Sequence, residues 1–196
     1  MSRGEKIRPS WPFYLSLKNL GFEKIIGVDE VGRGALAGPI VVAAVEINYL
    51  LPDITDSKLL TKKQRENLSD LIRENAVQIA IGEATNEEID EIGIAKAQTL
   101  AYQRALDQIK ADLVLTDFVH LENHRYLTST KGDQLFYPVA AASIVAKVHR
   151  DRQMTDLHSQ FPDYDWKNNV GYGTSKHLLT INKLGPSKWH RKTWLK

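Results

Sequence analysis

The feature that most limits the fold is a pair of apolar runs, rich in valine and isoleucine, joined by a short connection. The runs cover residues 24–29 and 39–47, and Gly32 and Gly34 lie between them. Apolar runs bounded by turn-forming residues are typical of buried strands. A parallel crossover needs about a dozen residues or more, so we expect these two strands to be antiparallel neighbours.

Signals for helices and strands alternate along the rest of the chain. Thr61 with Gln64 and Thr85 with Glu88 match the capping-box pattern. In a capping box, the side chain of each of the two residues accepts a hydrogen bond from the backbone amide of the other. The predicted helices span 61–74, 85–109 and 140–158, with a shorter one from about 174 to 184, and further strands are predicted at 77–84 and 113–118. This order predicts one α/β domain with a mixed sheet, ending in a helical segment from about residue 161.

The composition excludes several classes of protein. The chain has 196 residues, enough for one ordinary core, and contains no cysteine, which excludes disulfides, zinc–cysteine sites and thiol nucleophiles. No apolar run approaches the roughly 20 residues that span a bilayer, and the N-terminus lacks the apolar core of a signal peptide. We therefore expect a cytoplasmic protein without a membrane partner.

Charge is distributed unevenly. Up to Ala146 there are 16 Lys and Arg against 20 Asp and Glu, and from Lys147 onward there are 10 against 4. An acidic body with a basic end suits a carboxylate site beside a surface that holds phosphates. An ordinary solvated helical end explains the basic quarter equally well, so charge alone does not decide.

Carboxylates stand at the edges of apolar segments. Asp29 and Glu30 close the first apolar run, Asp117 closes the run at 113–116, and Asp133 precedes the run at 135–138. Burying a carboxylate costs several kcal/mol unless a cation or hydrogen bonds compensate. Any one of them can be a turn or cap residue, but the four together predict an oxygen-ligand site for a hard divalent ion. Because adjacent strand residues face opposite ways, Asp29 and Glu30 converge only if the strand ends or twists there.

The connection at 32–37 matches the glycine pattern of a dinucleotide-binding loop, which must open a helix. Here Gly38-Pro39 and a valine-rich strand follow, and two carboxylates precede it, so we reject that interpretation. Gly32 and Gly34 instead let the backbone approach a ligand closely, with Arg33 supplying a phosphate-binding charge. A plain hairpin turn is the alternative.

The segment Gly27-Val28-Asp29-Glu30-Val31-Gly32-Arg33-Gly34-Ala35-Leu36-Ala37-Gly38-Pro39 resembles ribonuclease HII, the type 2 ribonuclease H family. Three further segments agree in the same order: Asp56-Ser57-Lys58, the run 140–148 with Arg150-Asp151, and Gly171-Tyr172-Gly173-Thr174 with His177. The chain then closes on Gly185-Pro186 and His190-Arg191, so the resemblance extends from about residue 22 to the end.

This resemblance implies a ribonuclease H-like fold, a mixed central sheet flanked by helices. It implies a two-metal endonuclease, using Mg²⁺ or Mn²⁺, that cuts 5′ of a ribonucleotide in RNA–DNA hybrids or embedded in duplex DNA. The metal-binding and catalytic acids would be Asp29, Glu30, Asp117 and Asp133. The backbone of Gly32, Arg33 and Gly34 would contact the 2′-hydroxyl, Tyr172 would pack on the neighbouring sugar, and Lys58, Ser143 and Lys147 would hold phosphates. Such an enzyme would serve in removal of ribonucleotides and RNA primers, and we expect a monomer.

Some features depart from the family or lie outside it. Phe118 replaces an expected glycine, the ending Lys192-Thr193-Trp194 is atypical, and residues 1–20 form an extension without an assigned role. For the tail we predict that the nucleic-acid backbone is gripped by Lys176, Lys183, Lys188 and Arg191. We also predict that His177 makes a structural hydrogen bond, and that Trp166, Trp189 and Trp194 pack rather than stack on bases.

Two other functions remain open. A two-metal DNA nuclease or resolvase would keep the acids but has no use for a reader of the 2′-hydroxyl. A non-catalytic hybrid-binding module has no use for intact acids, which weaken phosphate binding.

Overall fold

The computed structural model describes residues 9–55, 57–117 and 119–195 of the chain. The strands are β1 (Ile25–Val31), β2 (Ile40–Glu46), β3 (Gln78–Ala84), β4 (Leu113–Asp117) and β5 (Tyr126–Ser129). The helices are α1 (Trp11–Asn19), α2 (Lys62–Asn75), α3 (Asn86–Ile92), α4 (Ile94–Leu106), α5 (Gly132–Leu135), α6 (Tyr137–Gln160), α7 (Trp166–Asn169) and α8 (Ser175–Leu184). Short 3₁₀ turns add η1 (Ser57–Leu59), η2 (Pro162–Tyr164) and η3 (Lys192–Trp194).

The strands form one mixed sheet in the order β3-β2-β1-β4-β5. β1 pairs with β2 and β2 with β3 in antiparallel fashion, whereas β4 lies parallel to β1 and to β5. The predicted antiparallel pair and the mixed sheet are therefore confirmed. The ladder between β1 and β4 ends at Val28 opposite Thr116, so the last residues of β1 have no partner on that side.

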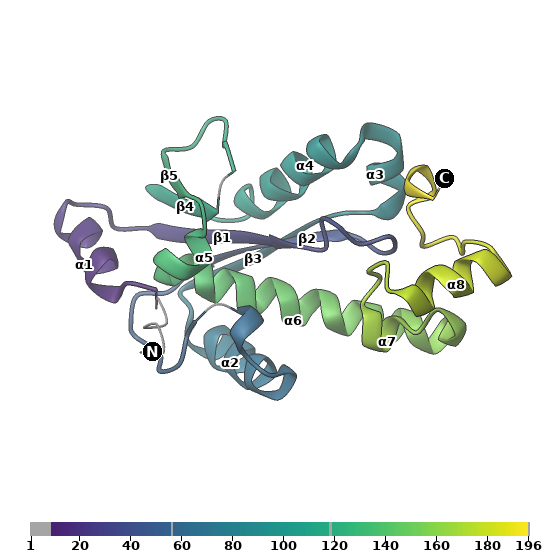
Figure 1. Cartoon of the computed structure of the whole chain (residues 1–196). Coiled ribbons are helices and arrows are strands. Elements are labelled where there is room, and N and C mark those ends of the chain that lie inside the picture. Colours follow the sequence, from purple (N-terminus) through teal and green to yellow (C-terminus); the bar gives the residue numbers. More distant parts are fainter. Residues whose placement is uncertain (1–8, 56, 118, 196) are drawn as a thin grey trace, which may run out of the picture.

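Helices cover both faces of the sheet, with α4 on one face and the long α6 on the other (Figure 1). Two glycines make these approaches possible, since a Cβ at Gly27 would lie 2.0 Å from the backbone of Pro138 on α6, and one at Gly82 would lie 2.0 Å from Ala101 O on α4. The alternation of side chains along β1 sends Ile26 and Val28 into the core beneath α4. Asp29 consequently faces α6 and Glu30 faces α4.

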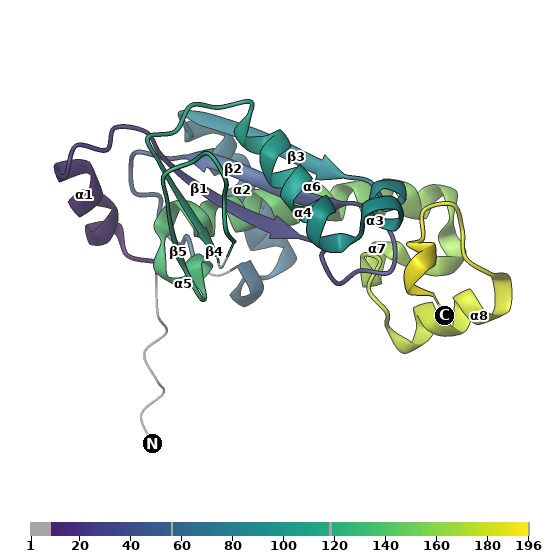
Figure 2. The same ribbon diagram turned by 90° about the horizontal axis from the view of Figure 1, so that it is seen from above.

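The two ends of the molecule carry separate packing units, α1 at one end and α7 with α8 at the other (Figures 1 and 2). On α1, the ring of Trp11 lies 4.7 Å from that of Tyr14, measured between centroids, and 5.0 Å from that of Tyr137 at the start of α6. The C-terminal unit packs around the fully buried Trp166, so the predicted helical tail and the packing role of that tryptophan are confirmed.

The structure corrects two sequence predictions and adds two elements that were missed. The helix expected over 85–109 is two helices, because Gly93 adopts φ 79° and ends α3 before α4 begins. The strand β5 and the helix α1 were missed, since β5 is a four-residue, half-exposed edge strand and α1 lies in the segment without an assigned role. β1 runs two residues further than predicted, through both acids. Among the described residues no helix is long and apolar enough to cross a bilayer.

Candidate active site

The site lies where β1 and β4 part. Asp117 is the last residue of β4, and Asp29 and Glu30 lie on β1 just past its last pair with that strand. The carboxyl ends of these parallel strands thus open onto a gap, the usual place for a site in such a sheet. Asp133 reaches the same gap from the first turn of α5.

A cleft of about 340 Å³ lies at this gap. Every residue predicted from the sequence to act in the site lines it, namely Asp29, Glu30, Gly32, Arg33, Gly34, Lys58, Asp117, Asp133, Ser143, Lys147 and Tyr172. The structure therefore brings together side chains from six separate parts of the chain. The cleft is also lined by Arg65 of α2, which no sequence motif singled out.

Asp29 and Glu30 converge although they face opposite sides of the strand. Asp29 is buried on the side of α6, where burial and the charges of Glu30 and Asp133 raise its pKa well above the usual value, partly offset by a hydrogen bond from Ser143. On the other side, Tyr102 of α4 donates to Glu30 Oε2 at 2.5 Å. Burial also raises the pKa of Glu30, against the opposing effects of Tyr102 and Arg33. These carboxylates are short of positive charge, as expected for cation ligands.

The other two acids, Asp117 and Asp133, lie at the first turn of α5. The amide of Gly132 donates to Asp117 Oδ1 at 3.1 Å. Asp133 is only 3% exposed and accepts a hydrogen bond from Lys58 Nζ at 3.2 Å. A Cβ at Gly132 would lie 2.8 Å from Thr116 O, which explains why a glycine begins this helix. Across the described residues, no three acidic or histidine side chains already form a closed set of metal ligands.

The glycine-containing turn, residues 32–38, contributes Gly32, Arg33 and Gly34 to the lining of the cleft. Gly32 adopts φ 90°, a conformation that favours glycine, and Gly34 is exposed. A Cβ at Gly34 would lie 3.9 Å from Cε1 of Tyr172, so the turn and that ring are neighbours. Within the described chain, the amides of Arg33 and Gly34 donate to no protein acceptor. They are therefore available to a ligand.

Tyr172 is held by a cluster of buried rings. His177 Nδ1 contacts Tyr172 O at 2.9 Å, and Trp166 Nε1–H donates to His177 Nε2 at 3.1 Å. Since His177 Nε2 is then an acceptor, its Nδ1 carries the proton and donates to Tyr172 O. His190 Nε2 lies 3.1 Å from the same acceptor and must donate to it. The predicted structural hydrogen bond of His177 is confirmed.

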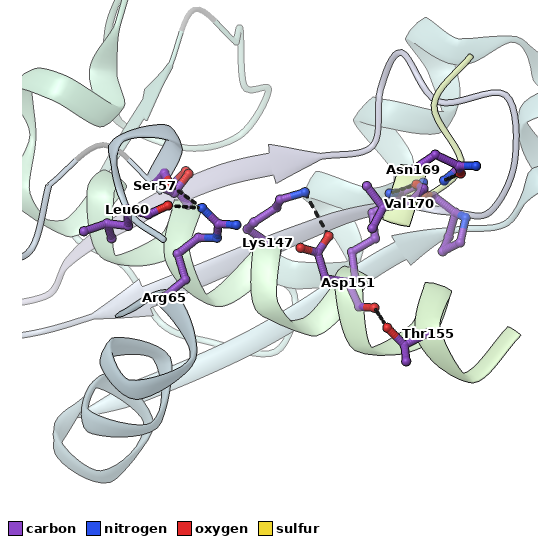
Figure 3. A network of polar contacts seen from close by, with 12 residues as sticks. Ser57, Leu60, Arg65, Lys147, Asp151, Thr155, Asn169 and Val170 are labelled. Atoms are coloured by element: carbon purple, nitrogen blue, oxygen red, sulfur yellow. Dashed lines mark hydrogen bonds and ion pairs between the residues drawn. The ribbon is translucent and has the colours of Figure 1, made fainter. Parts of the chain in front are cut away.

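Basic side chains line the side of the cleft formed by α2 and α6. Figure 3 shows Arg65 Nη1 donating to Ser57 O and Leu60 O, at 2.9 and 2.5 Å, and Lys147 paired with Asp151 at 2.9 Å. The side chain of Lys58 is 77% exposed. The cleft thus joins a carboxylate floor to a cationic side, which suits a phosphodiester whose charge must be both neutralised and positioned.

One predicted role is wrong. Arg191 cannot grip a nucleic-acid backbone, because it is fully buried and all its described hydrogen bonds go to backbone carbonyls. Of the tail lysines, Lys176 pairs with Asp165 at 2.8 Å. Asp56 of the Asp-Ser-Lys segment and the atypical Phe118 lie outside the described residues.

Comparison with known proteins decides the family. A model of the family Ribonuclease HII matches residues 26–196 of the chain. The chain belongs to the ribonuclease HII family. Ribonuclease HII of Synechococcus sp. (strain JA-3-3Ab) is 43% identical and aligns with 96% of this chain and 89% of its own length. That of Acholeplasma laidlawii is also 43% identical, over 92% and 96% of the two chains.

Solved structures agree on the fold. Ribonuclease HII of Archaeoglobus fulgidus, in a complex with PCNA, superposes with a TM-score of 0.75 at 26% identity, covering 88% of this chain and 96% of the other. Ribonuclease H2 of Pyrococcus horikoshii gives a TM-score of 0.72 at 26% identity over 88% and 94%. The chain is therefore a metal-dependent endoribonuclease of the ribonuclease H type, whose family acts on RNA–DNA hybrids.

Proposed function

We propose that this ribonuclease HII cuts the phosphodiester on the 5′ side of a ribonucleotide, leaving 3′-hydroxyl and 5′-phosphate ends. Its substrates would be RNA–DNA hybrids and single ribonucleotides embedded in duplex DNA. The observation that carries the proposal is one cleft in which four carboxylates face a glycine turn and Tyr172. The acids serve the hydrolysis and the turn serves the choice of sugar. Removal of misincorporated ribonucleotides and of RNA primers is the corresponding cellular role.

The carboxylates suit two divalent ions, Mg²⁺ or Mn²⁺. Hard oxygen ligands, the burial of Asp29 and the raised pKa of both β1 acids all fit a cation set. When bound, two such ions lower the pKa of an attacking water and stabilise the leaving oxygen. Asp29 would be one of the residues that hold these ions, and the charges of both Glu30 and Asp133 act on it. Glu30, Asp117 and Asp133 would complete the two coordination spheres.

The chain's own residues orient the carboxylates before any cation binds. Tyr102 fixes Glu30 from the α4 side, and the amide of Gly132 fixes Asp117 from the α5 side. On the α6 side, the Ser143 hydroxyl lies 2.9 Å from that of Ser57 and acts on Asp29. Groups that orient ligands in this way commonly change metal affinity by about 10–100-fold when removed.

The sugar is read by backbone. A 2′-hydroxyl is the one group that distinguishes a ribonucleotide from a deoxyribonucleotide at a given site, and it both donates and accepts hydrogen bonds. The free amides of Arg33 and Gly34 supply donors without a bulky side chain at Gly34. The neighbouring ring of Tyr172 offers a face on which the next sugar packs.

Phosphates would be held by Lys58, Lys147 and the segment around Ser143, with Arg65 beside them. Contacts to phosphates position a duplex but do not specify bases, so we expect weak sequence preference. We propose that the enzyme acts as a monomer, and the lack of cysteine fits the predicted cytoplasmic location.

The test uses a labelled duplex containing one ribonucleotide and its all-DNA twin, each incubated with Mg²⁺, Mn²⁺ or chelator. We expect cutting only 5′ of the ribonucleotide, only with metal, and none by Asp29→Asn. The matched control is Asp163→Asn, an exposed aspartate of η2, which should cut like wild type. Equal cutting of both duplexes would indicate a DNA nuclease instead. Binding to the hybrid that persists in chelator, without cutting in either metal, would indicate a binding module.

A further inference from the structure

Two buried arginines lie behind the glycine turn. Arg150 of α6 and Arg191, just before η3, have no exposed surface, and neither pairs with a carboxylate among the described residues. Burying a guanidinium group costs several kcal/mol unless hydrogen bonds compensate. Their partners therefore show what the fold gains from them.

Arg191 donates to the turn itself. Its Nη1 lies 2.8 Å from Arg33 O and its Nη2 lies 2.7 Å from Gly32 O. The same guanidinium donates to Gly38 O through Nε at 3.2 Å and Nη2 at 3.0 Å. One planar group thus holds the carbonyls at both ends of the turn.

These carbonyls belong to the two peptide units that carry the free amides. Gly32 C=O shares a peptide plane with the N–H of Arg33, and Arg33 C=O shares one with the N–H of Gly34. In a trans peptide the N–H points away from the C=O. With both oxygens bound to the buried Arg191, both hydrogens point away from it, toward the cleft that Arg33 and Gly34 line. A cationic donor on the oxygen also polarises the peptide and strengthens its N–H as a donor.

Arg150 ties the turn to the loop of Tyr172. It donates to Pro39 O at 2.9 Å and Ala37 O at 3.0 Å on one side, and to Val170 O at 2.8 Å on the other. Its Cζ lies 5.7 Å from the centroid of the Tyr172 ring. A Cβ at Gly32 would lie 2.2 Å from its Nε, so the guanidinium packs directly on the turn.

We propose that Arg150 and Arg191 are positioning residues that set the enzyme's recognition of ribose. Arg191 aims the two turn amides, and Arg150 fixes the distance between those amides and the Tyr172 ring. Neither touches the substrate or the carboxylates. This inference rests on the proposed function, because it concerns how the 2′-hydroxyl is read.

Lysine cannot replace either residue. Each arginine uses three nitrogens in a rigid fork toward separate carbonyls, whereas an ammonium is a single point charge on a flexible stem. Arg→Lys keeps the charge and removes the geometry, which isolates positioning from electrostatics. The matched control is Arg104→Lys, since Arg104 pairs with Glu88 at 2.6 Å on the α3–α4 surface, with 43% of its side chain exposed.

The experiment measures cutting of the single-ribonucleotide duplex by wild type, Arg150→Lys, Arg191→Lys and Arg104→Lys. We expect kcat to fall about 100-fold in the first two variants, the usual cost of a misplacement near 1 Å, with KM and Mn²⁺ affinity changing little. Because a lower folded fraction would also lower the apparent kcat without changing KM, kcat is expressed per folded molecule, with the folded fraction of each variant measured by circular dichroism. A merely structural role would leave this corrected kcat close to that of wild type. A kcat for both variants close to that of Arg104→Lys would overturn the proposal.

Hydrogen exchange in the free protein gives a readout that does not depend on activity. The amides of Leu36 and Ala37 donate to Gly171 O at 2.8 and 3.2 Å, joining the turn to the Tyr172 loop. We expect their exchange to accelerate about tenfold or more in either variant, relative to β2. If wild type does not cut at a ribonucleotide, the proposed function fails, and unchanged exchange would separately refute the positioning. Should one variant not fold, the other carries both measurements.

Discussion

The histidine pair in the C-terminal unit predicts a specific loss of stability in acid. Burial and the neighbouring His177 lower the pKa of His190 from 6.5 to about 4 in the folded chain. His190 is fully buried, and its Nδ1 accepts hydrogen bonds from the amide and the hydroxyl of Ser187, both at 2.9 Å. A proton on Nδ1 removes both bonds, so the folded state resists protonation that the unfolded chain accepts.

The sign and size follow from these two pKa values. Between them the unfolded state binds more protons than the folded state, so stability is complete above pH 6.5 and declines as pH falls toward 4. A shift from 6.5 to about 4 corresponds to a loss of about 2 kcal/mol at pH 5 and about 3 kcal/mol at pH 4. Burial lowers the pKa of His177 too, which adds to the loss in the same direction.

The acids of the cleft act in the opposite direction. The raised pKa values of Asp29 and Glu30 mean that the folded chain binds more protons there, so those groups stabilise the fold as pH falls. The wild-type curve alone is therefore a sum of opposing effects. The contribution of the histidine appears only in a difference between variants.

The assay compares thermal unfolding of wild type and His190→Gln at pH 7 and pH 5, followed by tryptophan fluorescence. Between these pH values wild type should lose about 4–8 °C in Tm more than the variant does, the equivalent of about 2 kcal/mol in a domain of this size. His124→Gln, on the loop before β5, is the control and should follow wild type. If His190→Gln loses as much Tm as wild type, the buried histidine does not couple folding to pH.

Three further outcomes are expected. Asp29→Asn should abolish cutting yet raise Tm in chelator, because it removes the desolvation of a buried charge and its repulsion by Glu30 and Asp133. Mg²⁺ should then raise the Tm of wild type only. Gly27→Ala should destabilise by about 3 kcal/mol or more, measured by urea unfolding, since its Cβ would meet the backbone of Pro138 at 2.0 Å. Trp11→Ala should lower the free energy of unfolding by about 2–3 kcal/mol in the same assay. It should also lower kcat, because α1 packs on the α5–α6 junction and α5 carries Asp133. An unchanged kcat would show that α1 acts on stability alone.

Local signals were sufficient for most of the fold. The capping boxes at Thr61 and Thr85 opened helices where predicted, and the short glycine connection joined antiparallel strands. The break at Gly93 was missed because helical periodicity continues across it, and only the φ of 79° at that residue shows the interruption. β5 was missed because its four residues are half exposed on an edge, where alternation of apolar and polar side chains is weak.

The members of the candidate site were predictable, but the support around them was not. Acids and glycines that break an apolar run are visible in a sequence, because such residues rarely lie there without a reason. Tyr102 gave no such signal, since a tyrosine on a helix is ordinary until its hydroxyl is found 2.5 Å from Glu30. Arg191 was wrongly predicted to bind the nucleic-acid backbone, because an arginine in a basic tail is usually exposed. Only the tertiary structure shows that this one is fully buried.

The distribution of charge around the turn links these observations. The cleft holds carboxylates whose pKa values are raised, and behind the turn lie two guanidinium groups whose pKa values burial lowers, that of Arg191 to about 9. Among the described residues, neither guanidinium pairs with a carboxylate. Carbonyls of the turn accept hydrogen bonds from both arginines instead. Direct pairing would neutralise the acids and remove their affinity for cations. In our proposal the two guanidinium groups orient the peptide groups of the turn so that its amides face the cleft, and the carboxylates remain available to metal ions.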